Sequence, residues 1–238
     1  MKTSMHRRFA SLLAALLAAD LAPQASAADY VDLRRIEPIH GDVAAGAAKA
    51  AVCFACHGPS GNAIVPTFPR LAGQRADYLY HRLDAFKHAD PKDPYVAQAP
   101  MLAIVAGLSD TDMRNLAAFF AAQPPAATTP VVAAPAAGEG EAIFRQGDPA
   151  HGVPPCAGCH GADANGIAAT EGKQYLAWPA LRGQNAVYVV SRLNNFRNRL
   201  PNHSSNDFIM HGVARTLDDG SIQAIAAWLA SLPPQPTH

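Results

Sequence analysis

The sequence predicts an all-α protein built from two copies of one helical unit. No segment shows the alternation of apolar and polar residues that marks a β-strand. The hydrophobic fraction of 49% comes largely from alanine, the residue with the highest helix propensity. An internal repeat is the third observation, because matched residues recur in the same order across most of the chain of 238 residues.

The repeat starts with a five-residue motif, Cys-x-x-Cys-His, found at residues 53–57 and again at 156–160. Each copy continues with Pro-x-Leu-x-Gly-Gln, at residues 69–74 and 179–184. The later matched positions are Tyr78, Arg82, Leu83, Phe86, Met101 and Leu108 in the first copy, and Tyr188, Arg192, Leu193, Phe196, Met210 and Leu217 in the second. Each copy has about a hundred residues, near the lower end for a self-sufficient core.

Cys-x-x-Cys-His is the attachment motif of c-type haem. Two thiols at this spacing can each form a thioether with the porphyrin, and the adjacent imidazole then binds the iron. The alternatives are a thiol redox pair or a shared four-cysteine zinc site, although the gap between the pairs is far longer than is usual for zinc. All four cysteines fall within the motifs. We therefore expect two covalently bound haem c groups, attached at Cys53, Cys56 and His57 and at Cys156, Cys159 and His160.

Each iron then needs a sixth ligand or keeps an open face. Met101 and Met210 are matched between the copies, in what we interpret as proline-bearing loops before each last helix. Filling of core gaps is the alternative role for both, and it is the role that we assign to Met113, which matches Ile222. The rival ligands, which have no histidine at the matched position and which we interpret as surface residues, are His81, His88, His203 and His211.

Groups around each iron can also be proposed from the repeat. A metal-bound imidazole usually donates its other N–H to an acceptor that fixes the ring, and the carbonyls of Pro69 and Pro179 are our candidates. Arg82 and Arg192 share a helix face with apolar residues, and a buried cation needs an anionic partner. We expect them to bind haem propionates near the domain interface, with solvated surface arginines as the alternative.

Residues 1–27 are typical of a cleavable secretory signal. Basic residues precede an apolar run of leucine and alanine, and residues 25–27 read Ala-Ser-Ala, which fits the A-x-A cleavage rule. An uncleaved anchor is the alternative, but the run is too short to span a bilayer. Cleavage removes three basic residues and one acidic residue, which changes the net charge from zero to −2. No run of basic residues indicates nucleic acid as a partner.

The remaining pattern predicts the order of elements. In the first copy we expect helices at 42–56 and 75–88 and a last helix capped by Ser109, with Asp112 completing a capping box. Residues 124–137 contain four prolines and no charge, which indicates a semi-stiff linker. The second copy begins with a helix at 139–146, has seven extra residues between its motif histidine and Leu181, and ends in a helix capped by Asp218. The predicted domains are 28–123 and 138–238.

With these residues the chain resembles the class I cytochromes c, and within them the dihaem cytochrome c4 family. The resemblance rests on the two Cys-x-x-Cys-His motifs, on residues 68–74 and 147–153, and on Met101 followed by Leu-Ser-Asp at 108–110. It covers essentially the whole chain after residue 27. It implies two tandem class I cytochrome c domains related by a pseudo-twofold axis. By position it maps the proximal iron ligands to His57 and His160, the distal ligands to Met101 and Met210, and the proline acceptors to Pro69 and Pro179.

The resemblance also implies electron delivery in the bacterial periplasm, commonly towards a terminal haem–copper oxidase. Iron with histidine on one side and methionine on the other has no free position for substrate, and methionine raises the reduction potential. We therefore expect an electron carrier rather than an enzyme. Expected partners are a quinol-oxidising bc complex or another donor, the oxidase as acceptor, and peripheral contact with inner-membrane complexes. The alternatives are a cytochrome subunit of a periplasmic dehydrogenase, or a dihaem enzyme of the thiosulfate dehydrogenase or peroxidase type.

Overall fold

The computed structural model describes residues 31–90, 92, 99–127, 137–198 and 204–235. The signal sequence predicted for residues 1–27 lies outside these residues, as do positions 128–136 of the predicted linker and His203. Across the described residues the regular elements are helices, with two isolated β-bridges and no strand. The all-α prediction is therefore confirmed. None of the described helices is long and apolar enough to cross a membrane.

The first half of the described chain, residues 31–127, contains five α-helices and one 3-10 turn. They are α2 (Val43–Lys49), α3 (Ala51–His57), η1 (Pro59–Gly61), α4 (Ala76–Lys87), α5 (Met101–Ala106) and α6 (Asp110–Ala121). The single helix expected at 42–56 is thus two helices that meet at Ala50. There the chain tightens, because the Ala50 N–H bonds to the carbonyl of Ala47, three residues back, and the Ala50 side chain is fully buried.

The second half, residues 137–235, repeats this order with additions. Its elements are α7 (Ala137–Gln146), η2 (Pro149–His151), α8 (Ala157–His160), η3 (Ala169–Glu171), η4 (Lys173–Tyr175), α9 (Ala186–Asn198), α10 (Ser205–Ala214) and α11 (Asp219–Ser231). Two of the 3-10 turns lie in the segment with the seven extra residues. Helix α7 starts at Ala137, within the predicted linker and two residues before the predicted start.

The two matched methionines do not lie in loops, so that part of the prediction is wrong. Met101 is the first residue of α5, and Met210 lies in the second turn of α10. The prolines that suggested a loop precede these helices, and Pro100 is itself the N-cap residue of α5. Proline fits there because the first residues of a helix need no N–H for an intrahelical bond.

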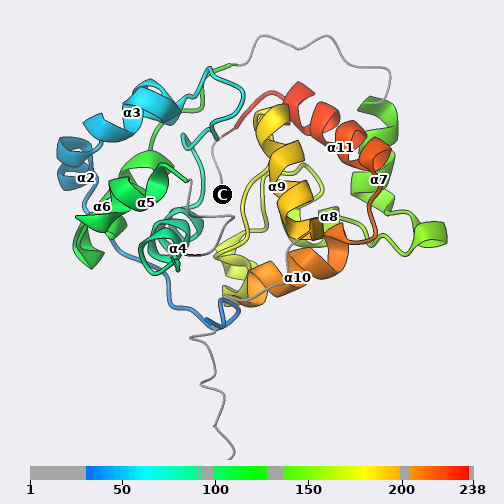
Figure 1. Ribbon diagram of the computed structural model, residues 1–238, viewed down its shortest axis with the longest axis horizontal. Coiled ribbons are helices and arrows are strands. Elements are labelled where there is room, and N and C mark those ends of the chain that lie inside the picture. Colours follow the sequence, from blue (N-terminus) through cyan, green and yellow to red (C-terminus); the bar gives the residue numbers. More distant parts are fainter. Residues whose placement is uncertain (1–30, 91, 93–98, 128–136, 199–203, 236–238) are drawn as a thin grey trace, which may run out of the picture. The chain divides into compact units, whose positions relative to one another are not determined.

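The last helix of each half forms the centre of its core. In Figure 1, α6 packs on α2 and α4, and α11 packs on α7 and α9. Ser109 and Asp112 form the predicted capping box at the start of α6, and Asp218 caps α11. The apolar faces predicted for these helices are buried, including Met113, which is only 2% exposed. The other buried residues of these faces are Leu116, Ala117 and Phe120, and Ile222, Ile225, Ala226 and Leu229.

One glycine in each half allows the first and last helices to cross closely. A Cβ atom at Gly46 of α2 would overlap the carbonyl oxygen of Asn115 in α6, and one at Gly140 of α7 would overlap that of Ala224 in α11. Both opposing atoms belong to helix backbone, so they cannot turn aside as a side chain would. The crossings therefore require glycine.

The chain offers a matched pair of variants to test the crossing in the second half. Gly140→Ala should lower the free energy of unfolding by about 1–3 kcal/mol, the usual cost of overpacking. Gly138 lies in the same helix, and a Cβ atom there would meet open space, so Gly138→Ala should be neutral or slightly stabilising because alanine favours helix. Denaturant unfolding of both variants measures the difference. Equal stabilities for the two variants would contradict the proposed role of Gly140.

Candidate haem sites

The first motif histidine is buried and its ring is held by one hydrogen bond. His57 ends α3, and Gly58 follows with φ of 73°, a left-handed conformation that favours glycine. His57 is 7% exposed, and its ring Nδ1 lies 2.9 Å from the carbonyl oxygen of Pro69. With Nδ1 donating to this carbonyl, the lone pair resides on Nε2, the atom that remains for a metal ion.

The second histidine repeats this arrangement. His160 ends α8, is also 7% exposed, and places its Nδ1 3.0 Å from the carbonyl oxygen of Pro179. The prediction that both proline carbonyls accept from the motif histidines is therefore confirmed. Burial lowers the pKa of both imidazoles below the ordinary histidine value, and the bond to the proline carbonyl partly offsets this. The neutral ring is the form that binds iron.

The cysteines are free thiols with the spacing that thioether attachment requires. Cys53 and Cys156 are half-buried and pack against the cores of their own halves. Burial raises the pKa of the Cys156 thiol to about 11 and also raises the pKa of Cys53. Among the described residues, which include all four cysteines, no three His, Cys, Asp or Glu side chains gather as a metal site. The two cysteine pairs therefore do not come together as the zinc alternative requires.

The methionine helices pack on the helices that follow the two motifs. α5 packs on α4, and α10 packs on α9. Met101 and Met210 are both half-buried. Of the rival histidines, His88 and His211 place Nδ1 at 3.0 Å and 2.8 Å from carbonyl oxygens of Asp84 and Phe196. The His81 ring packs edge-on against Tyr80, with 4.9 Å between the ring centroids.

Two glutamines, Gln74 and Gln184, join the halves next to the prolines that bind the motif histidines. The Gln184 amide accepts from the Arg70 N–H at 2.9 Å and donates to the Arg70 carbonyl at 3.0 Å. The Gln74 amide makes the same two bonds to Ala180, at 2.9 Å and 2.8 Å. Arg70 and Ala180 each follow a proline whose carbonyl binds a motif histidine. The reciprocal pattern is what a pseudo-twofold contact between two copies produces.

A pair of tyrosines and a pair of arginines lie at the same junction. The phenol groups of Tyr78 and Tyr188 lie close enough to interact, and burial, followed by this neighbour, raises the pKa of Tyr78. Arg82 and Arg192 both act on Tyr78 electrostatically and oppose that rise. Each arginine also stacks within its own helix, with its Cζ 5.2 Å from the Phe86 ring centroid and 4.6 Å from that of Phe196 respectively. The four repeated side chains thus converge, although they come from different halves.

The residue after each glutamine reaches across as well. Asn185 donates to the Phe68 carbonyl at 2.7 Å, and Arg75 donates to the carbonyl of Ile167. Ile167 belongs to the segment with the seven extra residues, so the insert takes part in the contact between the halves. Sequence reasoning found the repeated glutamines but not their role. The recurrence of Gly-Gln at the same position in both copies marks these residues, but it does not show that they bind the other half.

Comparisons with known proteins agree with this arrangement. The family model described as cytochrome c matches residues 43–123 and again residues 137–233. A tandem match with two complete attachment motifs defines a dihaem c-type cytochrome. The chain belongs to the cytochrome c family, and within it to the cytochrome c4 proteins.

Individual relatives support this assignment over most of the chain. Cytochrome c4 of Azotobacter vinelandii is 38% identical over 199 residues, which cover 81% of this chain and 90% of the relative. The crystal structure of reduced recombinant cytochrome c4 from Pseudomonas stutzeri matches with a TM-score of 0.69 and 35% identity, covering 81% of this chain and all of that one. A thiosulfate dehydrogenase electron acceptor of Thiomonas intermedia is 34% identical, over 82% of this chain and 84% of the relative.

The chain is therefore a dihaem electron-transfer cytochrome with two covalently bound haem c groups. The described residues fit this cofactor on three counts: free thiols at the right spacing, buried neutral imidazoles, and rings held so that Nε2 remains for the iron. A bound haem supplies a one-electron iron centre, and the protein supplies its orientation and surroundings.

The contact between the halves generates a testable prediction. Gln184→Ala should lower the free energy of unfolding by about 1–3 kcal/mol, because the buried Gln184 side chain supplies the partners of both Arg70 backbone groups, which are themselves partly shielded from water. Gln123 provides a matched control, since its amide donates to the Phe119 carbonyl at 2.9 Å within one half. Gln123→Ala should cost less, because water can replace the bond at that half-exposed position. Denaturant unfolding of the holoprotein compares the two, and a larger loss in Gln123→Ala would contradict the prediction.

Proposed function

We propose that this cytochrome is a periplasmic carrier in which both irons have histidine and methionine as axial ligands. His57 and Met101 serve the first iron, and His160 and Met210 the second. Cys53 and Cys56, and Cys156 and Cys159, form the thioethers. The observation that carries this proposal is the bond from each motif histidine to a proline carbonyl, which leaves Nε2 of both rings for iron.

The methionine assignment draws on position rather than on direct contact. Met101 and Met210 each precede by seven residues the leucine that leads into the last helix, Leu108 and Leu217. Both are half-buried, whereas Met113 is almost fully buried in the core of the first half. A core-filling role thus suits Met113 and leaves the matched pair as ligands. Ligation by methionine raises the reduction potential of haem iron.

The two haems act together in this proposal. Each motif histidine is linked through its proline to a residue that a glutamine of the other half holds, so the two sites are mechanically joined. Arg82 and Arg192 converge near Tyr78 at this junction and supply positive charge for the anionic propionates. Electrons can then pass between the two haems within one chain before they leave for a partner.

Location and domain limits follow from the sequence. We place a cleavable signal at residues 1–27, domains at 28–123 and 137–238, and a linker at 124–136, because α7 begins at Ala137. Attachment of c-type haem outside the bacterial cytoplasm agrees with an exported chain. We expect a quinol-oxidising bc complex or a comparable donor and a terminal haem–copper oxidase as acceptor, with peripheral contact at the inner membrane.

Similarity to one relative indicates an alternative electron donor. The Thiomonas intermedia protein is described as the electron acceptor of a thiosulfate dehydrogenase, and it resembles this chain over most of its length. A thiosulfate dehydrogenase is therefore the alternative donor, with this chain as its cytochrome partner. In either case the chain transfers electrons between redox proteins.

The carrier role can be tested with the purified holoprotein. Reduced protein should be reoxidised rapidly by bacterial membranes that contain a haem–copper oxidase, in a cyanide-sensitive reaction. It should not turn over thiosulfate or hydrogen peroxide, because both irons lack a free position. Steady turnover of either substrate by the isolated chain would show that it is an enzyme. Reduction by added thiosulfate dehydrogenase and thiosulfate, against enzyme or thiosulfate alone, tests the alternative donor.

The axial ligands can be tested by substitution. Met101→Ala and Met210→Ala should each remove about half of the near-infrared sulfur-to-iron charge-transfer band, and each should lower one of the two reduction potentials. Met113→Leu is the control, because it conserves volume in the core and should leave the band whole. Absorption spectra and redox titrations measure both effects. A complete band in either alanine variant would show that another residue binds that iron.

A further inference from the structure

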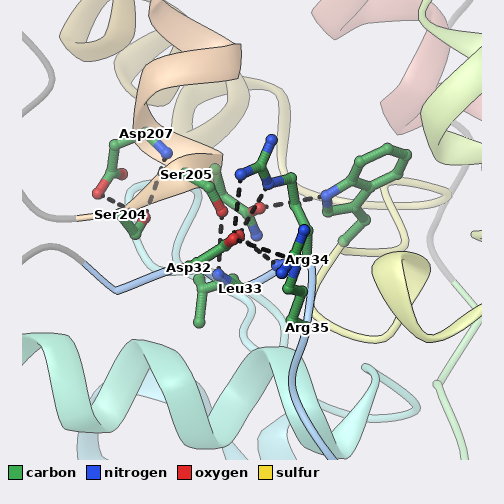
Figure 2. Close-up of polar contacts among 9 residues, drawn as sticks. Asp32, Leu33, Arg34, Arg35, Ser204, Ser205 and Asp207 are labelled. Atoms are coloured by element: carbon green, nitrogen blue, oxygen red, sulfur yellow. Dashed lines mark hydrogen bonds and ion pairs between the residues drawn. The ribbon is translucent and has the colours of Figure 1, made fainter.

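The segment that precedes the first cytochrome domain lies on the second one. Residues 31–37, which we call the strap, come before the start of the family match at residue 43. They contact the loop and helix start at Ser204 and Ser205, more than 160 residues further along the chain. Figure 2 shows the strap residues beside the N-terminus of α10. The strap thus lies outside the two segments that the family model matches.

Backbone bonds fix the strap to this place. Val31 and Ser204 form a parallel β-bridge, and the Ser205 N–H donates to the Val31 carbonyl at 3.0 Å. The Leu33 N–H donates to the Ser205 hydroxyl oxygen, also at 3.0 Å. Leu33 is 8% exposed and Ser205 2% exposed, so the bond between these two residues is shielded from water. Shielded bonds of this kind leave unsatisfied groups behind when they are broken.

The strap keeps its shape through a local turn and a second contact. Asp32 accepts from the backbone N–H of Arg34 at 3.1 Å and from its Nε at 2.8 Å, as Figure 2 shows. Glu37 pairs with Lys173 of the insert at 2.5 Å. Two residues later, the Ile39 N–H donates to the Asp77 carboxylate of α4 at 2.8 Å. The strap therefore leads from the second half directly into the first.

The helix to which the strap binds carries Met210. Ser204 caps α10 by accepting from the Asp207 N–H at 3.2 Å, and Met210 follows in the next turn. The methionine helix of the first half is anchored differently, because α5 begins at Met101 itself and its N-cap, Pro100, makes no side-chain capping bond. The strap contacts α10, whereas the equivalent helix of the first half, α5, is anchored differently. A change at the second iron alone would therefore distinguish loss of the strap contact from a general loss of stability.

We propose that the strap is a positioning element for the second iron site, with Ser205 as its anchor on α10. The proposal rests on the ligand role proposed above for Met210. The strap holds the start of α10, and α10 holds the methionine. Loosening the strap therefore raises the fraction of molecules in which Met210 is away from the iron. Such molecules bind added ligands at the second iron and have a lower reduction potential there, while the first site is unaffected.

Two variants test the contact between the strap and α10, one changed in α10 and the other in the strap. Ser205→Ala removes the acceptor on α10 and leaves the Ser204 cap in place. Replacement of residues 31–35 by alternating glycine and serine removes the strap side chains and its preferred conformation. Arg35→Ala is the control within the strap, because the Arg35 side chain is 86% exposed and only approaches Asp32, with Nε 4.0 Å from its Oδ2. All three are made in the full-length holoprotein.

Cyanide binding to the oxidised protein measures access to each iron. We expect the rate at the second haem to rise about threefold to tenfold in Ser205→Ala, as loss of one buried hydrogen bond implies. The strap replacement should raise it by at least as much, and Arg35→Ala should not change it. A double variant that combines Ser205→Ala with the strap replacement should match the strap replacement alone, because both changes weaken the same contact. The second potential should fall in parallel, and the charge-transfer band of that site should weaken.

Spectra of Met101→Ala and Met210→Ala assign the cyanide-binding phases to the two haems. If Met210→Ala leaves the band whole, Met210 is not the ligand and the strap proposal fails with it. If Met210→Ala removes its share while both strap variants bind cyanide like the parent, the strap proposal alone is wrong. Equal acceleration at both haems would also overturn it, since the effect would then be global. Additive effects in the double variant would mean that Ser205 supports α10 independently of the strap.

Discussion

Each haem site depends on one hydrogen bond, from a buried histidine to a proline carbonyl. The bond selects the tautomer of His57 and of His160, and it fixes the direction in which the remaining nitrogen points. It also fixes the loop that contains the proline, because the next residue is held by a glutamine of the other half. The metal ligand, the loop and the domain contact are therefore parts of one connected set of bonds.

This connection has a consequence for how two small domains form one electron carrier. Domains of about a hundred residues bury limited apolar surface, and contacts between domains are usually polar and mobile. Here the buried glutamine amides satisfy partly buried backbone groups of the other half, so separation of the halves would leave several donors and acceptors unpaired. A contact with that cost keeps the two sites in a constant relation, which a relay between two haems requires.

The two sites are nevertheless not copies in their surroundings. The second half has an insert whose Lys173 pairs with Glu37 and whose Ile167 carbonyl binds Arg75 of the first half. The strap adds a further contact at α10, whereas α5 begins with its methionine and has no side-chain cap. Differences of this kind around equivalent ligands are what allows two haems of the same type to have different potentials, since the surroundings tune the iron.

The sequence by itself determined the cofactor, the number of sites, the proline acceptors and most helices, because these depend on local spacing. Two thiols and an imidazole within five residues define an attachment site whatever the fold around them. Ser109 and Asp112 likewise cap a helix through bonds between residues only three positions apart. Only the tertiary structure decided how Gln184 meets Arg70, 114 residues away, and how the strap meets Ser205, 172 residues from Leu33. It also showed that Met101 and Met210 lie in helices rather than in the predicted loops. Contacts over such separations depend on the packing of whole helices, and no local pattern of residues encodes them.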